Sequence, residues 1–142
     1  DSGWYGALSL GGGGASTYQE NVTNGWTGWL RVGTQVPTES GNMVSPTKKG
    51  VLDRIGLCNH TPKCTYDNFK PKCPKLMIIP VISGAPIGGQ VTILGFAGFF
   101  VDEFVGHGGG DNFIRGRFVE FVAEGEMGPA GQYGAVTIKL IN

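Results

Sequence analysis

The stretch that decides the fold is Gly89–Glu103, GQVTILGFAGFFVDE, in which β-branched and aromatic residues crowd together. Two further apolar-rich runs follow it, Asn112–Val122 and Tyr133–Ile141, and in both of them apolar residues alternate with polar ones. This alternation is typical of strands with one buried face, and β-branched and aromatic residues favour strands. Gly-rich segments separate the runs, so Leu76–Asn142 is predicted to form strands joined by turns, with almost no helix.

Length and composition restrict the class of protein. The 142 residues suit one domain, 1–142, that is large enough to bury a core of its own. Eleven basic residues balance eleven acidic ones, so the net charge gives no reason to expect nucleic acid or an anionic membrane as a partner. The 26 glycines occur beside plentiful aromatic residues, which indicates tight turns and bulges in a β fold rather than disorder.

Two features bear on location. The chain contains no run of eighteen apolar residues, so no membrane span is expected within it. It begins at Asp1 without an initiator Met, which suggests a processed segment of an exported protein. We therefore expect an extracellular or cell-surface location.

The first half of the chain offers fewer strands. Trp4–Leu10 is a short apolar segment before the run Gly11–Gly14, which is expected to be a hinge or turn because ordering four glycines costs much backbone entropy. Residues 1–14 are therefore either an N-terminal extension or the first strand. Trp26–Val32 is a second strand candidate, and Thr34–Met43 is predicted to be a loop.

One helix is predicted, over residues 45–56. Ser45 is a suitable N-cap, Pro46 suits the first helical position, and Gly56 ends the segment. The apolar residues of the helix, expected to share one face, are Val51, Leu52 and Ile55.

A loop of about twenty residues, Gly56–Lys75, contains every cysteine of the chain. Loops of this length tend to be functional or internally braced. A disulfide between two of the cysteines would brace the loop and leave the third thiol free or paired with another chain. Alternatively, three thiolates and an imidazole could complete a tetrahedral zinc site, although their spacing matches no standard zinc finger. A third alternative is inert thiols. The four residues concerned are Cys58, His60, Cys64 and Cys73.

The sequence contains little that resembles a catalytic motif. His107 lies in Gly106–Gly110, which superficially resembles the oxyanion-hole glycines of esterases, but no Gly-x-Ser-x-Gly nucleophile motif accompanies it. We therefore expect no enzyme activity.

Several short blocks of sequence occur in order along nearly the whole chain. They are Trp4–Gly14, Thr38–Thr47 leading to Gly50-Val51, Cys64–Asn68 with Cys73-Pro74, Ile79–Val81, Leu94–Ala97 and Gly116–Val119. Together they resemble the C-terminal extracellular region of TadE/TadG-like proteins from tight-adherence (Flp) pilus loci. The membrane-inserted N-terminal helix usual in that family is not in this sequence. The resemblance implies a cell-surface protein associated with pili, and it carries over no catalytic residue.

These observations predict an all-β domain, a β-sandwich or distorted barrel with one short helix and a Cys-containing loop. The expected function is that of a non-catalytic, secreted structural subunit, pilus-associated or filament-forming, whose partners are copies of itself or other surface subunits. The alternative is a small ligand- or metal-binding extracellular module with the Cys/His site. Subunit contacts are predicted for apolar residues near the N-terminus, Trp4, Tyr5, Leu8 and Leu10, with unlike charges over 48–75 and 102–126 assisting register.

Overall fold

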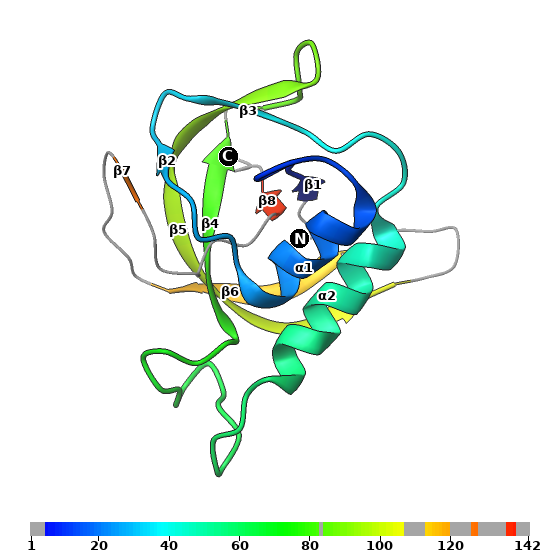
Figure 1. Cartoon of the computed structure of the whole chain (residues 1–142). Coiled ribbons are helices and arrows are strands. Elements are labelled where there is room, and N and C mark those ends of the chain that lie inside the picture. The colour runs from blue at the N-terminus through cyan, green and yellow to red at the C-terminus, as the bar shows by residue number, and fades with distance from the viewer. Residues whose placement is uncertain (1–4, 83, 107–112, 120–125, 128–135, 139–142) are drawn as a thin grey trace.

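The computed structural model describes residues 5–82, 84–106, 113–119, 126–127 and 136–138 (Figure 1). It confirms a mainly-β fold with a helix at the predicted place. The elements, in chain order, are β1 (Tyr5–Ala7), α1 (Ala15–Asn24), β2 (Leu30–Arg31), β3 (Gln35–Pro37), α2 (Val44–Gly56), β4 (Leu76–Ile82), β5 (Gln90–Val105), β6 (Phe113–Val119), β7 (Glu126–Met127) and β8 (Val136–Ile138).

Strand β5 is the centre of the main sheet, and it is the stretch that the sequence marks as decisive. It pairs antiparallel with β4, from Leu76 opposite Phe100 to Ile82 opposite Ile93. Its start pairs with β3 and its second half with β6, both antiparallel. At 16 residues β5 is long enough to hold three partners at once.

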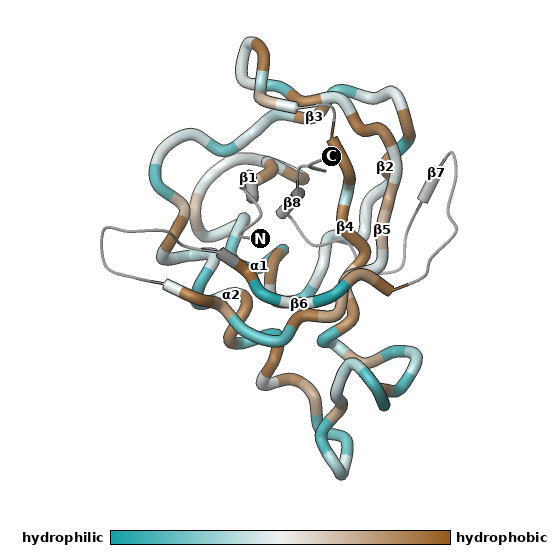
Figure 2. The backbone as a smooth tube through the Cα atoms, turned by 180° about the vertical axis from the view of Figure 1, so that it is seen from behind, coloured by the Kyte–Doolittle hydropathy of each residue, from teal (hydrophilic) through white to brown (hydrophobic). Residues whose placement is uncertain are grey.

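Two register shifts bend this sheet. One lies between Val81 and Ile82 on β4, and the other between Val101 and Glu103 on β5. A register shift of this kind marks an extra residue in one of the two paired strands, and such a β-bulge bends the strand and increases its twist. Figure 1 shows β5 curving beneath the helices, and Figure 2 shows the apolar stretches of β4 and β5 beside each other.

The strand order is β1-β8-β4-β5-β3, with β6 beside β5, and the path is open between β1 and β3. All pairs in it are antiparallel except β4 and β8, which are parallel. One isolated bridge, Leu8 with Thr38, nonetheless connects the residues that follow β1 to those that follow β3. Two backbone bonds flank it, Ser9 N to Pro37 O at 2.9 Å and Glu39 N to Ala7 O at 2.9 Å.

Helix α2 begins one residue before the predicted helix and ends at the predicted residue, but the sequence predicts only some of the residues that it buries. Its first residue donates its N–H to Asn42 Oδ1 at 2.9 Å, so the cap comes from Asn42 and not from Ser45. Leu52, predicted to be inward, is 48% exposed. The residues that α2 buries are Thr47, Gly50, Val51 and Arg54.

The prediction of a single helix is wrong, because α1 also forms. Its N-terminus follows directly from Gly14, whose N–H is accepted by Glu39 Oε1 at 3.0 Å. The other carboxylate oxygen of Glu39 accepts from Ser9 Oγ at 2.7 Å. Glu39 thus fixes Gly14, the N-cap residue of α1, from a distant loop, and the glycine run is a braced turn rather than a free hinge.

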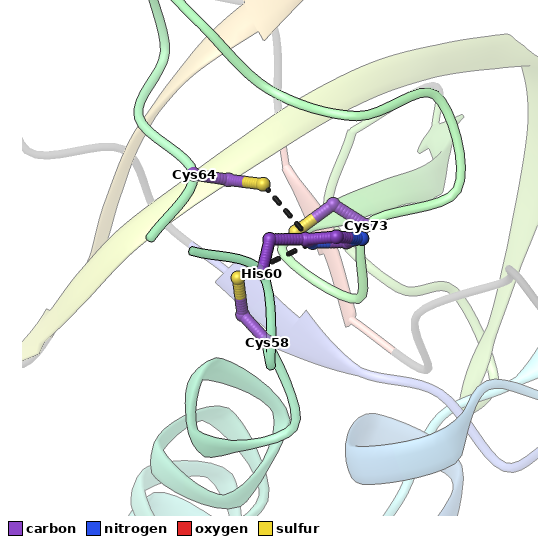
Figure 3. A group of neighbouring side chains, drawn as sticks. All are labelled: Cys58, His60, Cys64 and Cys73. Atoms are coloured by element: carbon purple, nitrogen blue, oxygen red, sulfur yellow. Dashed lines mark hydrogen bonds between the residues drawn. The ribbon is translucent and has the colours of Figure 1, made fainter. Parts of the chain in front are cut away.

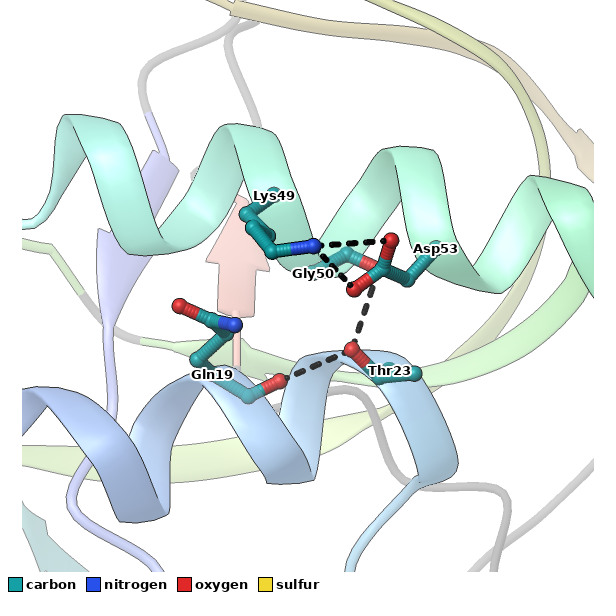
Figure 4. A network of polar contacts seen from close by, with 5 residues as sticks. All are labelled: Gln19, Thr23, Lys49, Gly50 and Asp53. Atoms are coloured by element: carbon teal, nitrogen blue, oxygen red, sulfur yellow. Dashed lines mark hydrogen bonds and ion pairs between the residues drawn. The ribbon is translucent and has the colours of Figure 1, made fainter.

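The two helices pack closely on each other (Figure 4). A Cβ at Gly50 would lie 2.7 Å from Val22 Cβ, so the absence of a side chain there permits the close approach. Thr23 Oγ1 donates to Gly50 O at 3.4 Å, and the buried hydroxyls of Tyr18 and Thr47 are 2.5 Å apart.

The other strand predictions are partly met. Of Trp26–Val32 only β2 is a strand, paired with β7, and the predicted loop 34–43 contains β3. The segment 112–122 contains β6, and 133–141 contains β8. No helix within the described ranges is both long enough and apolar enough to span a membrane.

Candidate metal centre

The loop between α2 and β4 brings together the four residues that the sequence singled out. The ligand atoms of Cys58, His60, Cys64 and Cys73 all lie within 4.8 Å of one another. His60 faces the sulfurs with Nδ1, which is 3.2 Å from Cys64 Sγ and 3.7 Å from Cys58 Sγ. Figure 3 shows the side chains converging from separate parts of the loop.

The backbone places each ligand. Cys58 follows the end of α2, where its N–H bonds Ile55 O at 3.2 Å. Cys64 precedes a tight turn in which Thr65 and Asn68 exchange backbone bonds, both 3.0 Å. Cys73 closes another turn, with its N–H on Lys70 O at 3.1 Å, immediately before β4. The site is therefore anchored at one end by a helix and at the other by a buried strand.

Aromatic packing attaches the loop to the sheet. The three cysteines form a second buried cluster with Phe100 of β5, apart from the main core. Tyr66 and Phe69 pack on Phe100, with ring centroids 6.4 Å and 5.1 Å away. The guanidinium of Arg117 on β6 lies 4.9 Å above the ring of Tyr66. The sulfurs thus lie in a largely water-free setting beneath the loop.

Two lysines bond the backbone of the ligand residues. Lys75 Nζ donates to Cys64 O at 2.9 Å and also lies 5.9 Å from the centroid of Phe100. Lys63 Nζ donates to the carbonyl of Cys58. These bonds hold the turns of the loop in place. They also keep the positive charges of the two lysines near the cysteines.

The thiols of Cys58 and Cys73 have opposite pKa shifts. The backbone N–H of Cys64, followed by the N–H and ring of His60 and the thiol of Cys73, lowers the pKa of Cys58 to about 6 against the opposing effect of burial. Burial raises the pKa of Cys73 to about 12, although the backbone N–H of Lys75 partly offsets it. The directions of the two shifts favour the thiolate form of Cys58 and the thiol form of Cys73 in the metal-free site.

The donor set fits zinc by chemistry and by spacing. Thiolate and imidazole are the ligands of structural zinc sites, among them Cys₃His, with bonds of about 2.3 Å to sulfur and about 2.0 Å to nitrogen. Tetrahedral bonds of these lengths put ligand atoms about 3.5 to 3.8 Å apart. The distances from His60 Nδ1 to two of the sulfurs lie close to this range. No two ligand atoms are more than 4.8 Å apart, so the four side chains would move only slightly closer together to bind zinc.

The structure also places residues that sequence reasoning did not connect with the site. These are Lys63, Lys75, Phe100 and Arg54. Phe100 was predicted only as a strand residue, and nothing in its sequence position points to the loop. Arg54 lies in the charged range 48–75, for which the sequence predicts a role in subunit contacts, but it is only 3% exposed.

The other predicted residues lie elsewhere. Leu8 and Leu10 are buried in the main core of their own chain, at 0% and 2% exposure, and Tyr5 belongs to β1. Trp4 and His107 lie outside the described residues. A chain that buries Leu8 and Leu10 itself could offer them to a neighbour only by strand exchange, so a role for this segment in assembly stays a prediction.

Comparison with known proteins finds no counterpart: no protein-family model, no curated protein and no solved structure matches the chain significantly. The resemblance to TadE/TadG-like proteins therefore stays a prediction from the sequence blocks.

Proposed function

We propose that this chain is a non-catalytic binding and structural module in which Cys58, His60, Cys64 and Cys73 hold one zinc ion. The convergence of three sulfurs and one imidazole nitrogen within 4.8 Å carries this proposal. When bound, zinc would supply four bonds that tie the loop to itself, in place of the apolar residues that the loop lacks.

A metal accounts for the geometry better than a disulfide does. The three cysteines are free in the structure, and all three sulfurs lie at one centre. A disulfide would use two sulfurs and leave the third thiol and His60 beside them without a role. The backbone N–H groups directed at Cys58 also favour its thiolate form, which metals bind and disulfides do not contain.

Metal analysis of the purified protein tests the proposal. We expect one zinc per chain after purification without chelator, and one Co²⁺ per chain with the absorption bands of a tetrahedral sulfur site after exchange. Cys64→Ser should lose most of the affinity. A matched control is Ser45→Ala, which alters an exposed residue on α2.

Thiol titration of the denatured, metal-stripped and unreduced protein separates the alternatives. Three reactive thiols are expected for a zinc site and one for a disulfide. Three thiols in a protein that binds neither Zn²⁺ nor Co²⁺ would sink the zinc proposal.

For the fold, we propose that the main sheet forms a distorted barrel with the helix pair packed on it. The bridge between Leu8 and Thr38 supports this, because it links the segments beyond the two end strands of the open path. Amide exchange tests the idea: the N–H of Ser9 and Glu39 should be protected as strongly as amides of the sheet interior.

For the whole protein, we propose the role that the ordered sequence blocks imply: an extracellular, pilus-associated or filament-forming subunit that acts by protein–protein contact. Negative-stain imaging of native material tests it. Fibres, or particles attached to pili, are expected. Monodisperse single-chain particles that bind no pilus component would count against it.

A further inference from the structure

Arg54, in the last turn of α2, is buried and joins three parts of the fold. Its side chain is only 3% exposed. Nε donates to Val22 O at the end of α1, at 2.7 Å, and Nη1 donates to Pro74 O at 2.9 Å. Pro74 directly follows the ligand Cys73. One guanidinium therefore links both helices to the chain that carries a proposed zinc ligand.

The charge of Arg54 has no compensating partner among the described residues. Its Nη2 is buried without a hydrogen-bond acceptor there, and burial lowers the pKa of the guanidinium to about 10. A buried, unpaired cation is costly and needs a reason for its position.

The proposed zinc site would supply that reason. Three thiolates outweigh the two charges of zinc by one negative charge, and the C-terminus of α2, which ends just before Cys58, adds partial negative charge. A guanidinium in the last turn of that helix offsets both. Electrostatic attraction in such a poorly hydrated region is stronger than in water.

We propose that Arg54 is a positioning residue for the metal centre, holding the Cys73 segment against the helix pair and offsetting the charge of the loaded site. The inference rests on the proposed zinc site. The bond from Nη1 to Pro74 O depends on the position of the chain beside Cys73, and zinc bound to Cys73 would hold the chain in that position. By linkage, Arg54 then stabilises the zinc-loaded protein more than the metal-free one and so raises zinc affinity.

The experiment compares zinc affinity, by chelator competition at constant pH, in wild-type protein, Arg54→Met, Arg54→Lys and Lys49→Met. Loss of an outer-shell partner commonly weakens metal binding about ten- to a hundredfold, and we expect this for Arg54→Met. Arg54→Lys keeps the charge but cannot reach both carbonyls, so its affinity should fall severalfold. Lys49→Met, an exposed change on the same helix, should leave affinity unchanged.

A second readout separates positioning from plain stability. Co²⁺-loaded Arg54→Met should keep the wild-type absorption bands, because no ligand changes. Equal destabilisation of its loaded and metal-free forms, with unchanged affinity, overturns the inference. If Arg54→Met does not fold, unchanged affinity of Arg54→Lys overturns it. Failure of the wild-type protein to bind zinc instead overturns the proposed function.

Discussion

Cys58 has a thiol pKa well below that of an ordinary cysteine, which favours metal binding. Hydrogen bonds from the N–H of Cys64 and then from His60 lower its pKa from 9.0 to about 6. Metal ligands must lose their protons before they bind, so a thiol that is already ionised at neutral pH is the natural first ligand. Its neighbour Cys73 has the opposite shift, because burial favours the neutral thiol.

This difference predicts the pH titration of the metal-free protein. Thiolate absorbance at 240 nm should show one step near pH 6, which Cys58→Ser removes and Cys73→Ser keeps. Because the folded pKa lies below the unfolded value of 9.0, ionised Cys58 stabilises the fold fully above pH 9. That contribution is lost as pH falls toward 6. Absence of any thiolate below pH 8 would contradict the prediction.

The ligand residues could be predicted from the sequence, whereas their surroundings could not. Three cysteines and His60 within sixteen residues suffice to suggest a site, because a short loop can always bring its own residues together. Phe100 and Arg54 come from β5 and α2, and their meeting with the loop depends on the packed fold. The spacing of these residues in the sequence is compatible with both a disulfide and a zinc site. Only the positions of the sulfurs in space show whether two of them converge or all three.

Among the elements, α1 shows where sequence patterns fail. Its sequence ASTYQENVTN is mostly polar and buries only Tyr18, Asn21 and Val22. Its N-cap residue, Gly14, has no capping side chain and is held by Glu39, 25 residues away, so no local signal marks the start. Helix α2 could be predicted because its proline, glycine and apolar residues are all local. Short β2 and β3 similarly depend on partner strands distant in sequence.

The contact between α1 and α2 yields a prediction with a control in the same helix. A Cβ at Gly50 would lie 2.7 Å from Val22 Cβ and 3.1 Å from Gln19 O, so Gly50→Ala should force the helices apart. We expect a loss of about 1–3 kcal/mol in the free energy of unfolding. Gly56→Ala meets no atom within 4 Å and should have little effect or a small stabilising one.

Urea unfolding of both variants, followed by far-UV circular dichroism, measures the difference. The zinc-loaded form should be used throughout, so that metal occupancy is constant. Equal stability of Gly50→Ala and Gly56→Ala would show that the helices do not pack at this distance.

At the scale of the whole molecule, the residues that the structure describes form two buried clusters of different kinds. The main core collects buried side chains from residues 8–10, both helices and β2–β5, and includes none of the candidate ligands. The second contains the three cysteines with Phe100, and Tyr66, Phe69 and Val119 pack against it. Loss of zinc should therefore release the loop while the main core stays folded.

Limited trypsin digestion with and without chelator tests this division. In the metal-free protein, cleavage is expected after Lys63 and Lys72, but not after Lys70, because Pro71 follows it. Zinc should protect both bonds, since it fixes the ligands Cys64 and Cys73 that directly follow them. Lys48 and Lys49, in the middle of α2, serve as internal controls and should resist cleavage in both states. Mass spectrometry identifies the cut bonds, and circular dichroism should show that the sheet persists in chelator. Equal cleavage of loop and helix without zinc would mean that the metal holds the whole fold together rather than the loop alone.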